Sequence, residues 1–447
     1  MGHAEHSVHR QAAAPSLSLD AYWMPFTPNR DFKRDPKLVV RGEGMYLWND
    51  RGDKLIDASS GLFCVNAGHC RREIADAVSA QLRELDFVAP FTRGHPKQFE
   101  LATRVAELTP GDLDHIFFVN SGSEAVDSAM KLALAYHQAR GQSGRTMFVS
   151  RERAYHGVNF GGTALSGIVN NRRKFGPGVA GVAHMRHTHL QDNLFTPGEG
   201  AVGVELAEDL QRIVNLYGAE NIAACFVEPI AGSTGCLVPP KGYLKRLREI
   251  CDMHGILLVF DEVITGFGRT GQAFASQSFG VTPDVITMAK GITNGAQPMG
   301  AVAISERIHD TVMGAAAEDT IEFFHGYTYS GHPASCAAGI ATLDVYRNDG
   351  LFDKGRELSQ YFLDALFSLR DLPGVTDIRG YGMFGAIDLA SDGTPGKRGH
   401  AFQKKLFDNG LHLKATGDAA LVAPPLIAER EHIDRIADIL RRTLATL

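Results

Sequence analysis

Two side chains suited to amine and carbonyl chemistry follow apolar runs in the middle of the chain. Asp261 comes directly after the run at 256–260, and Lys290 follows the run at 285–288. A carboxylate withdrawn from water needs a cationic or hydrogen-bonding partner, and pairing it with a protonated pyridine nitrogen makes that ring an electron sink. A lysine withdrawn from water has a lowered pKa and can form a Schiff base.

Both residues also have plainer interpretations. Asp261 is compatible with a structural ion pair to an arginine or with a magnesium ligand of an ATP site, and Lys290 with a surface lysine. The chain contains no G-x-x-x-x-G-K-[ST] motif, which argues against the ATP site. The two residues are 29 positions apart (290 − 261), the length of one strand–helix–strand excursion. We therefore expect both side chains to reach one pocket.

A turn rich in hydroxyl groups is a third candidate. Residues 120–123 (Asn-Ser-Gly-Ser) lie between a predicted strand at 115–119 and a predicted helix at 123–140. Ser121 and Glu124 have the S-x-x-E spacing of a capping box. Backbone N–H groups at a helix N-terminus, with a glycine that allows close approach, can bind phosphate. The turn is a candidate phosphate site, and an ordinary capping turn is the alternative.

Other candidates also follow predicted strands. Tyr155, next to His156, offers an aromatic plate for a planar ring, with core packing as the alternative. Glu228 directly follows a fully apolar run. Thr328 precedes an alanine-rich helix with Pro333 in its first turn, and it is a second candidate phosphate donor.

The elements that would position these residues alternate between short apolar strands and helices. Strands are predicted at 115–119, 146–149, 224–227, 256–260 and 285–288. This alternation is typical of an α/β fold with a mostly parallel sheet covered on both faces. Ligands bind such sheets outside the carboxyl ends of the strands, which is where Asp261, Lys290 and the other candidates lie.

The pattern divides the chain into four parts. We predict a flexible tail at 1–20 without a signal peptide, a segment at 21–74 that contributes to a smaller domain and the substrate entrance, a large cofactor-binding domain at 75–340, and a small α+β domain at 341–447. The last part combines a long helical pattern, short strands and a terminal helix from about Glu431.

Composition and charge exclude several classes of function. The chain has 447 residues, of which 44% are hydrophobic, and a net charge of −6. It contains no long basic run for nucleic acid or a membrane surface, and no stretch of the ~18 apolar residues that span a membrane. Six cysteines without a C-x-x-C pair suit reduced thiols, so we expect a cytoplasmic protein.

Three further patterns are weaker. Residues 266–271 match G-x-G-x-x-G, but the next acid, Asp284, is only 13 positions later (284 − 271) and precedes a strand, which is unlike a dinucleotide site. No metal site is expected, because no carboxylate or cysteine stands at ligand spacing from His184, His187 and His189. Burial as small apolar side chains is expected for Cys225, Cys236 and Cys251.

Together these features resemble the class III (omega) aminotransferases, which are pyridoxal-phosphate enzymes of fold type I. Segment 260–271, F-D-E-V-I-T-G-F-G-R-T-G, is highly specific for that group and accounts for the glycine pattern. Segment 326–333, G-Y-T-Y-S-G-H-P, fits it as well. Similarity to β-alanine (omega-amino acid):pyruvate aminotransferases is carried by three segments: 23–30 (W-M-P-F-T-P-N-R), 64–69 (C-V-N-A-G-H) and 84–87 (E-L-D-F).

The resemblance implies a role for each matching residue. Lys290 would form the Schiff base with pyridoxal 5′-phosphate and move the substrate proton, and Asp261 would pair with the pyridinium nitrogen. Tyr155 and Val263 would pack on the two faces of the ring. Further cofactor contacts would come from Ser121, Gly122, Ser123, His156, Glu228 and Thr328. Because Thr328 would serve the partner subunit, the resemblance implies a homodimer or a tetramer of dimers.

The substrate pocket departs from the family pattern. Trp23, Phe63 and Phe91 would line its entrance, and Phe63 stands where a tryptophan is frequent. Lys414 stands where an arginine commonly binds the substrate carboxylate. A lysine supplies charge without the planar two-pronged fork of an arginine. We therefore expect looser carboxylate recognition, or a shift toward another acid or an amine donor.

The implied activity is the transfer of the terminal amino group of an omega-amino acid such as β-alanine, or of an amine, to pyruvate by a ping-pong mechanism. The expected products are an aldehyde or ketone and alanine. The expected partners are the amine donor, the keto acid and a second copy, without nucleic acid or membrane. The alternatives are a 4-aminobutyrate, taurine or diamine transaminase, a decarboxylating transaminase or aminomutase, an NAD-dependent dehydrogenase and a non-catalytic binding protein.

Overall fold

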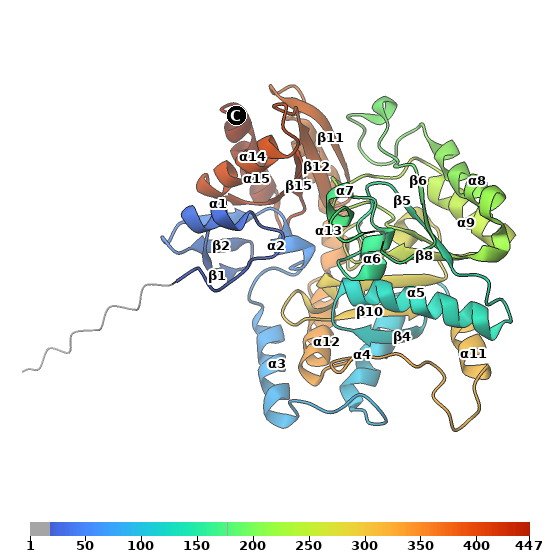
Figure 1. Cartoon of the computed structure of the whole chain (residues 1–447). Helices are drawn as coiled ribbons and strands as arrows, with labels where there is room; N and C mark the ends of the chain where they lie inside the picture. Colours follow the sequence, from blue (N-terminus) through green and yellow to red (C-terminus); the bar gives the residue numbers. More distant parts are fainter. Residues whose placement is uncertain (1–17, 177) are drawn as a thin grey trace, which may run out of the picture.

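A seven-stranded sheet forms the centre of the molecule in the computed structural model, which describes residues 18–176 and 178–447 (Figure 1). Its order is β4-β10-β9-β8-β7-β5-β6. The strands are β4 (His115–Val119), β5 (Met147–Arg151), β6 (Val182–Met185), β7 (Ile222–Val227), β8 (Leu257–Asp261), β9 (Val285–Ala289) and β10 (Gly300–Ile304). Five of them are the predicted strands, and β6 and β10 were not predicted. Most of the tail predicted at 1–20 lies outside the described residues.

The sheet is mostly parallel, as predicted. Strands β6, β5, β7, β8 and β9 pair in parallel, and β10 runs antiparallel to both β9 and β4. Strand β4 therefore has the same direction as β9. Consequently the carboxyl ends of β4, β5, β7, β8 and β9 all meet at one edge of the sheet. This is an α/β fold of the class that the sequence predicted.

Helices cover both faces of this sheet. Helix α5 (Gly122–Ala139) packs on one face, and α9 (Tyr243–His254), α4 (Pro96–Ala106) and α12 (Pro333–Asn348) lie on the other side (Figure 1). Successive residues of β8 divide between the two faces: Val259 belongs to the apolar cluster under α5, whereas Leu258 belongs to the larger cluster opposite. Burial on both faces explains why these strands are continuous apolar runs.

Helix α5 shows how the sequence positions the site. The Ser121 hydroxyl accepts a hydrogen bond from the Glu124 N–H at 3.2 Å and caps the helix. The Glu124 carboxylate reaches the N–H of Asn120 at 2.7 Å, one residue before the position that a full capping box requires. A buried stripe that includes Val126 and Met130 then holds the helix on the sheet.

Two four-stranded sheets complete the fold. One contains β1 (Val39–Glu43), β2 (Tyr46–Asn49), β3 (Lys54–Asp57) and β13 (Leu411–His412), and the other contains β11 (Val375–Tyr381), β12 (Phe384–Leu389), β15 (Ala419–Val422) and β14 (Lys414–Thr416). Parallel pairing of β13 with β3 joins segments far apart in the sequence, and Figure 1 shows these N-terminal strands beside α14 (Lys397–Asp408) and α15 (Arg430–Leu444).

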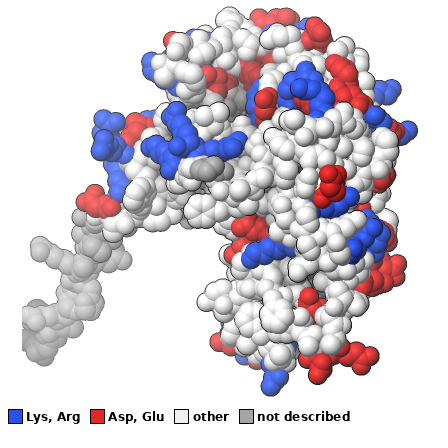
Figure 2. Space-filling model, turned by 45° about the vertical axis from the view of Figure 1, so that its right-hand side comes forward, with Lys and Arg blue, Asp and Glu red and all other residues white. Residues whose placement is uncertain are grey.

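The other main helices are α3 (Arg72–Glu84), α8 (Glu208–Tyr217), α11 (Glu306–Gly314) and α13 (Leu351–Phe367), and the shorter ones are α1 (Asn29–Arg34), α2 (Ser60–Phe63), α6 (Phe160–Leu165), α7 (Val169–Arg172) and α10 (Ala275–Phe279). Among the described residues, no helix combines the length and apolar character needed to cross a membrane. On the face shown in Figure 2, basic residues are interspersed with acidic and uncharged ones.

Candidate active site

The carboxyl edge of the large sheet collects the residues that the sequence singled out. Asp261 is the last residue of β8, Lys290 directly follows β9, and Glu228 directly follows β7. The turn that begins at Ser121 follows β4, and Tyr155 lies in the loop after β5. Because these strands point in one direction, all five positions lie at one edge.

Asp261 is a buried carboxylate whose two oxygens are held from the protein side. His156 donates from Nδ1 to Oδ2 of Asp261 at 2.8 Å, and the N–H of Val263 donates to Oδ1 at 3.1 Å. Asp261 and His156 are both buried. Nε2 of His156 has no hydrogen-bond partner among the described residues. The arrangement fixes the carboxylate in one orientation, ready for a further cationic N–H donor.

Glu228 organises the loop that carries Tyr155. One of its carboxylate oxygens accepts from the N–H of Tyr155 at 2.9 Å, and the other accepts from the N–H of Gly232 at 2.9 Å. Arg151 donates to the backbone carbonyl of Glu228 at 2.8 Å. Burial raises the pKa of the Glu228 carboxyl. Glu228 is therefore a positioning residue that joins the ends of β5 and β7.

Lys290 carries an amine in a dry environment. Its backbone has φ +51°, in the left-handed region, so the chain turns sharply after β9. Loss of water lowers the pKa of its ammonium, against the opposing influence of the Cys64 thiol and the Asp261 carboxylate. Within the described residues the ammonium has no hydrogen-bond or ion-pair partner, and the residue is partly exposed. Lys290 therefore loses its proton and becomes a neutral amine at a lower pH than an ordinary exposed lysine does.

The turn after β4 has the close packing of a small anion cradle. A Cβ at Gly122 would lie 2.9 Å from a methyl group of Val263, and one at Gly157 would lie 2.6 Å from the Ser123 hydroxyl. Gly157 has φ +100°, which a side chain would disfavour. The Ser123 hydroxyl also accepts from the N–H of Val158 at 3.1 Å. The two glycines let the loops after β4 and β5 meet at the N-terminus of α5.

These residues fit pyridoxal 5′-phosphate. The N-terminus of α5 with Ser121, Gly122 and Ser123 suits a phosphate, the oriented carboxylate of Asp261 suits a protonated pyridine nitrogen, and the amine of Lys290 suits the cofactor aldehyde. The N–H of Val263 donates a hydrogen bond to Asp261, and this bond fixes Val263 and the Asp261 carboxylate relative to each other.

The predicted entrance residues lie in different environments. Phe63 is buried, with its ring centroid 5.4 Å from that of Phe384. Trp23 and Phe91 are exposed on the single chain, and Phe91 packs beside Gly326, where a Cβ would come within 3.1 Å of its ring. The structure therefore does not bring Trp23, Phe63 and Phe91 together within one chain.

Lys414 lies on the face of its four-stranded sheet that contributes to an apolar cluster. Register across β14, β15 and β12 places Lys414, Leu421 and Ala386 on one face of the small sheet, and the last two belong to the same apolar cluster as Phe63 and Ile264. Loss of water lowers the pKa of the Lys414 ammonium. It forms no hydrogen bond or ion pair with any residue that the structure describes. Lys414 therefore shares a sheet face with residues that cluster with Ile264 of the loop after Asp261.

The glycine pattern at 266–271 holds an arginine rather than a dinucleotide. Arg269 is fully buried and donates to the backbone oxygens of Met383 and Pro424 and to the side chains of Ser60 and Asn66. Burial lowers its pKa to about 10. Cβ atoms at Gly268 and Gly271 would collide with neighbouring side chains, so the space beside this loop is filled.

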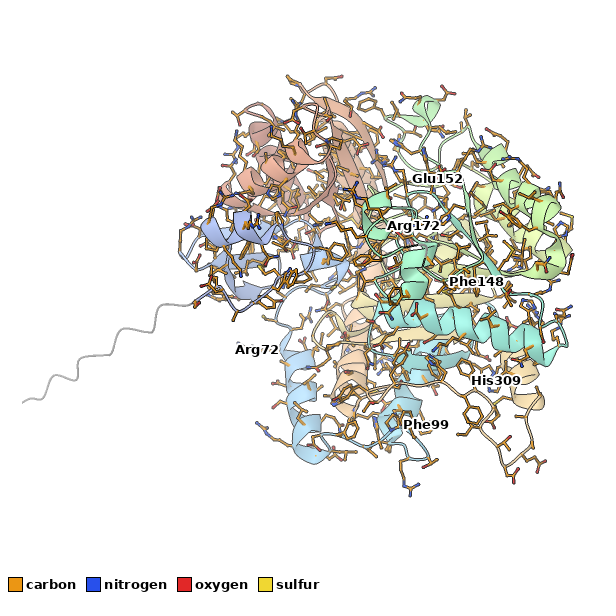
Figure 3. The ribbon with its side chains drawn as sticks, in the orientation of Figure 1. Arg72, Phe99, Phe148, Glu152, Arg172 and His309 are labelled. Atoms are coloured by element: carbon orange, nitrogen blue, oxygen red, sulfur yellow. The ribbon has the colours of Figure 1, made fainter. Side chains whose placement is uncertain are left out.

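Two groups that contain histidines, one at His189 and one at His115, make contacts with other protein side chains. Contrary to the sequence interpretation, His189 does have a carboxylate neighbour, Asp377 at 3.1 Å, but the guanidinium of Arg379 occupies the same cluster. His115 and His309 stack in parallel at 3.6 Å between centroids. Figure 3 places His309 on α11, and His115 begins β4, so this pair lies at the opposite edge from Asp261. Cys225, Cys236 and Cys251 are buried, as predicted.

Sequence reasoning missed Gly157 as part of the cradle and the link from Ser128 to His325 described below. A glycine directly after Tyr155 and His156 was the available signal for the first. The second joins residues 197 positions apart and has no local sequence signal.

Comparisons with known proteins agree with this geometry. The family model described as aminotransferase class-III matches residues 29–444. The chain is 53% identical to an omega-aminotransferase of Caulobacter vibrioides, covering 95% of this chain and 97% of the relative, and 47% identical to a beta-alanine–pyruvate aminotransferase of Pseudomonas aeruginosa, covering 96% of each. Among solved structures, an (S)-enantioselective omega-transaminase from Thermomicrobium roseum superposes with a TM-score of 0.89 at 35% identity, covering 95% and 96% of the two chains. An omega transaminase from Pseudomonas jessenii in complex with PMP gives a TM-score of 0.89 at 31% identity, with the same coverage.

Proposed function

The chain belongs to the class III aminotransferase family, and on this premise we propose that it transfers the terminal amino group of an omega-amino acid, or of a related amine, to pyruvate. The observation that carries the proposal is the shared edge of Lys290, the oriented carboxylate of Asp261 and the phosphate-type turn at the start of α5. Enzymes of this family use pyridoxal 5′-phosphate. The relatives named for β-alanine and omega-amino acids, at 47% and 46% identity, support the substrate class.

Bound pyridoxal phosphate supplies an electron sink for the bond that breaks at the substrate carbon. Lys290 Nζ holds the cofactor between turnovers and then acts as the base and acid that moves the substrate proton. The lowered pKa of its ammonium makes the neutral amine more readily available for this work. Asp261 keeps the pyridine nitrogen protonated, and His156 keeps Asp261 in place. Tyr155 and Val263 would pack on the two faces of the ring.

Lys414 is the residue that we assign to the substrate carboxylate. Its ammonium lies on the face of the small sheet that packs with Phe63, and it has no acidic partner among the described residues. An omega-amino acid carries its carboxylate away from the reacting amine, so a cation across the pocket can bind it. A point charge binds a carboxylate with less directional specificity than an arginine fork.

A donor without a carboxylate is the second candidate. It is supported by the lysine at position 414, whose point charge binds a carboxylate with less directional specificity than an arginine fork. One relative, 34% identical, is named a putrescine–pyruvate aminotransferase.

We further propose that the active unit is a homodimer in which each chain completes its partner's site. Thr328 is exposed, and Phe91 beside Gly326 and Phe87 beside Tyr329 form an apolar surface next to it. Phe99 of α4, labelled in Figure 3, is exposed as well. Exposed apolar surface of this kind is typical of an interface.

The six unpaired cysteines suit the reducing cytoplasm, where we place the enzyme.

The oligomer is tested by sedimentation and by mixing variants. Lys290→Ala chains, inactive alone, and Thr328→Ala chains, weak alone at limiting cofactor, should regain activity when mixed, because a mixed dimer holds one intact site. Random mixing predicts about a quarter of the wild-type activity for a dimer with two-fold symmetry. A monomeric active enzyme, or a mixture no better than its parts, would refute the shared site.

The activity itself is tested by product analysis. Purified enzyme with pyridoxal phosphate, β-alanine and pyruvate should form alanine and the corresponding aldehyde with ping-pong kinetics, and Lys290→Ala should abolish both products. Formation of a ternary complex before any product leaves would rule out the mechanism. Activity with diamines alone would select the second candidate.

A further inference from the structure

The segment at 321–329, here called the strap, is an irregular loop that packs against α5 and carries Thr328. Its side chains alternate: Phe323, His325 and Tyr327 are partly buried, whereas Phe324 is 85% exposed and Thr328 is exposed. Phe323 and Tyr327 pack on the apolar cluster beneath α5. The strap is not part of a strand, so these inward side chains hold it in place.

His325 is the polar member of the inward set, and both of its ring nitrogens are occupied. Nε2 lies 2.8 Å from the hydroxyl of Ser128, and Nδ1 lies 3.3 Å from Nζ of Lys131. The ring stacks on Phe117 of β4, with centroids 5.6 Å apart and planes 17° apart. Phe323 and Tyr327 meet it edge-on.

These contacts require one protonation state. The ammonium of Lys131 can only donate, so Nδ1 must accept with its lone pair. Nε2 then carries the hydrogen and donates it to the Ser128 hydroxyl. If Nδ1 were protonated, its N–H would point at the positively charged ammonium of Lys131. Phe117, which stacks on the ring, has no carboxylate that could compensate for this repulsion. The contact with Lys131 therefore requires a neutral His325, and protonation replaces it with repulsion.

Ser128 connects this contact to the cofactor site. It is fully buried on α5, five residues after Ser123 (128 − 123), which is about 7.5 Å along the helix axis. Helix α5 therefore carries the phosphate turn at its N-terminus and, in its second turn, the Ser128 side chain that contacts His325 of the strap. Thr328 lies three residues beyond His325 and faces outward.

We propose that His325 is a positioning residue for cofactor phosphate binding: its neutral ring docks the strap on α5, and this dock places Thr328 for the phosphate in the partner's site. The inference rests on the proposed function, in which Thr328 serves the partner. It adds a pH-sensitive contact to that function, because acid replaces the contact between His325 and Lys131 with repulsion and so weakens the dock. The charged groups of α5 that lie near it are Lys131 at His325 and Glu124 and Asp127 at Tyr327.

The sign of the pH effect follows from the same contacts. Burial lowers the pKa of His325 below its ordinary value of 6.5, and Lys131 adds to this. The dock is complete when His325 is neutral and is lost as the pH falls through that lowered pKa. Cofactor phosphate binding should therefore weaken on the acid side of pH 6.5 and stay constant above it.

The test compares two ligands of the apoenzyme. Pyridoxal phosphate and pyridoxal differ by the phosphate alone, and their dissociation constants are measured by absorbance titration at pH 8. His325→Leu and Ser128→Ala should each weaken pyridoxal phosphate about tenfold and change pyridoxal less than twofold, which is the pattern that Thr328→Ala should also give. His325→Gln keeps a donor toward Ser128 but does not titrate, so it should restore affinity at pH 8. Between pH 8 and pH 5.5 it should lose less affinity for pyridoxal phosphate than the wild type does, because only the titration of the phosphate group itself remains.

The outcomes separate this inference from the proposed function. If Thr328→Ala leaves pyridoxal phosphate affinity unchanged, the shared site is wrong. If Thr328→Ala weakens it while His325→Leu and Ser128→Ala do not, only the role of His325 is overturned. Equal weakening of both ligands in the His325 and Ser128 variants, or an acid weakening as large in His325→Gln as in the wild type, also overturns it.

Discussion

At the scale of single residues, the candidate site combines side chains that stand at strand ends with contacts that are made across the fold. Lys290 and Asp261 stand at the ends of continuous apolar strands, so their shared edge could be inferred from the chain alone. Contacts made across the fold could not be inferred, because nothing local encodes them. The bond from His156 to Asp261 and the dock of His325 on Ser128 depend on how elements pack.

The charge on Lys414 should make carboxylate recognition sensitive to alkaline pH. Loss of water lowers its pKa below the ordinary 10.5, so the ammonium and its attraction for the substrate carboxylate are lost as the pH rises through that lowered value. For β-alanine, kcat/KM should fall at a lower pH in the wild type than in Lys414→Arg, since an arginine stays protonated. A primary amine without a carboxylate serves as the control and should give matching profiles. Identical β-alanine profiles for both enzymes would contradict the role of Lys414.

At the scale of elements, strong strand signals were predicted and weak ones were missed. Strand β10 consists of glycine, alanine and short aliphatic residues, and it enters the sheet antiparallel between β4 and β9. Its sequence, G-A-V-A-I, has little β-propensity at its start. Its position in the sheet depends on β4 and β9, because each of these strands pairs with it through backbone hydrogen bonds. The capping turn of α5 was predicted because its Ser121 signal is local.

The turn before α5 should lose cofactor affinity when its glycine is filled. A Cβ at Gly122 would lie 2.9 Å from a Val263 methyl group, so Gly122→Ala must displace a residue that borders Asp261. We expect the dissociation constant for pyridoxal phosphate to rise about tenfold or more, as for strain of about 1–3 kcal/mol. Titration of the apoenzyme measures it. Gly314→Ala on α11, with nothing within 4 Å, is the control and should bind normally. Equal affinities for both variants would argue against the cradle.

At the scale of the whole molecule, Arg269 links parts of the chain that are distant in sequence. Its guanidinium reaches Ser60 and Asn66 near the N-terminus and backbone carbonyls at Met383 and Pro424 near the C-terminus. Strand pairing of β13 with β3 joins the same regions. We propose on this basis that 21–74 and 341–447 act as one small domain against the large domain at 75–340.

Removing Arg269 should destabilise the fold. Arg269→Met leaves several buried oxygen atoms without a donor, so we expect the free energy of unfolding to fall by about 3 kcal/mol. Urea denaturation followed by circular dichroism measures the change. Arg435→Met, an exposed position on α15, should stay within about 0.5 kcal/mol of the wild type. A loss no greater than that of the control would contradict the linking role.

The most direct test of the central claim is the visible absorption spectrum of the purified protein with pyridoxal phosphate. We predict a yellow band that requires Lys290, bleaches when β-alanine is added and returns when pyruvate follows. Bleaching by other amines but not by β-alanine would keep Lys290 and the fold while changing the substrate class. If no band forms with added pyridoxal phosphate, or if the band is the same in Lys290→Ala, the account of this site is wrong.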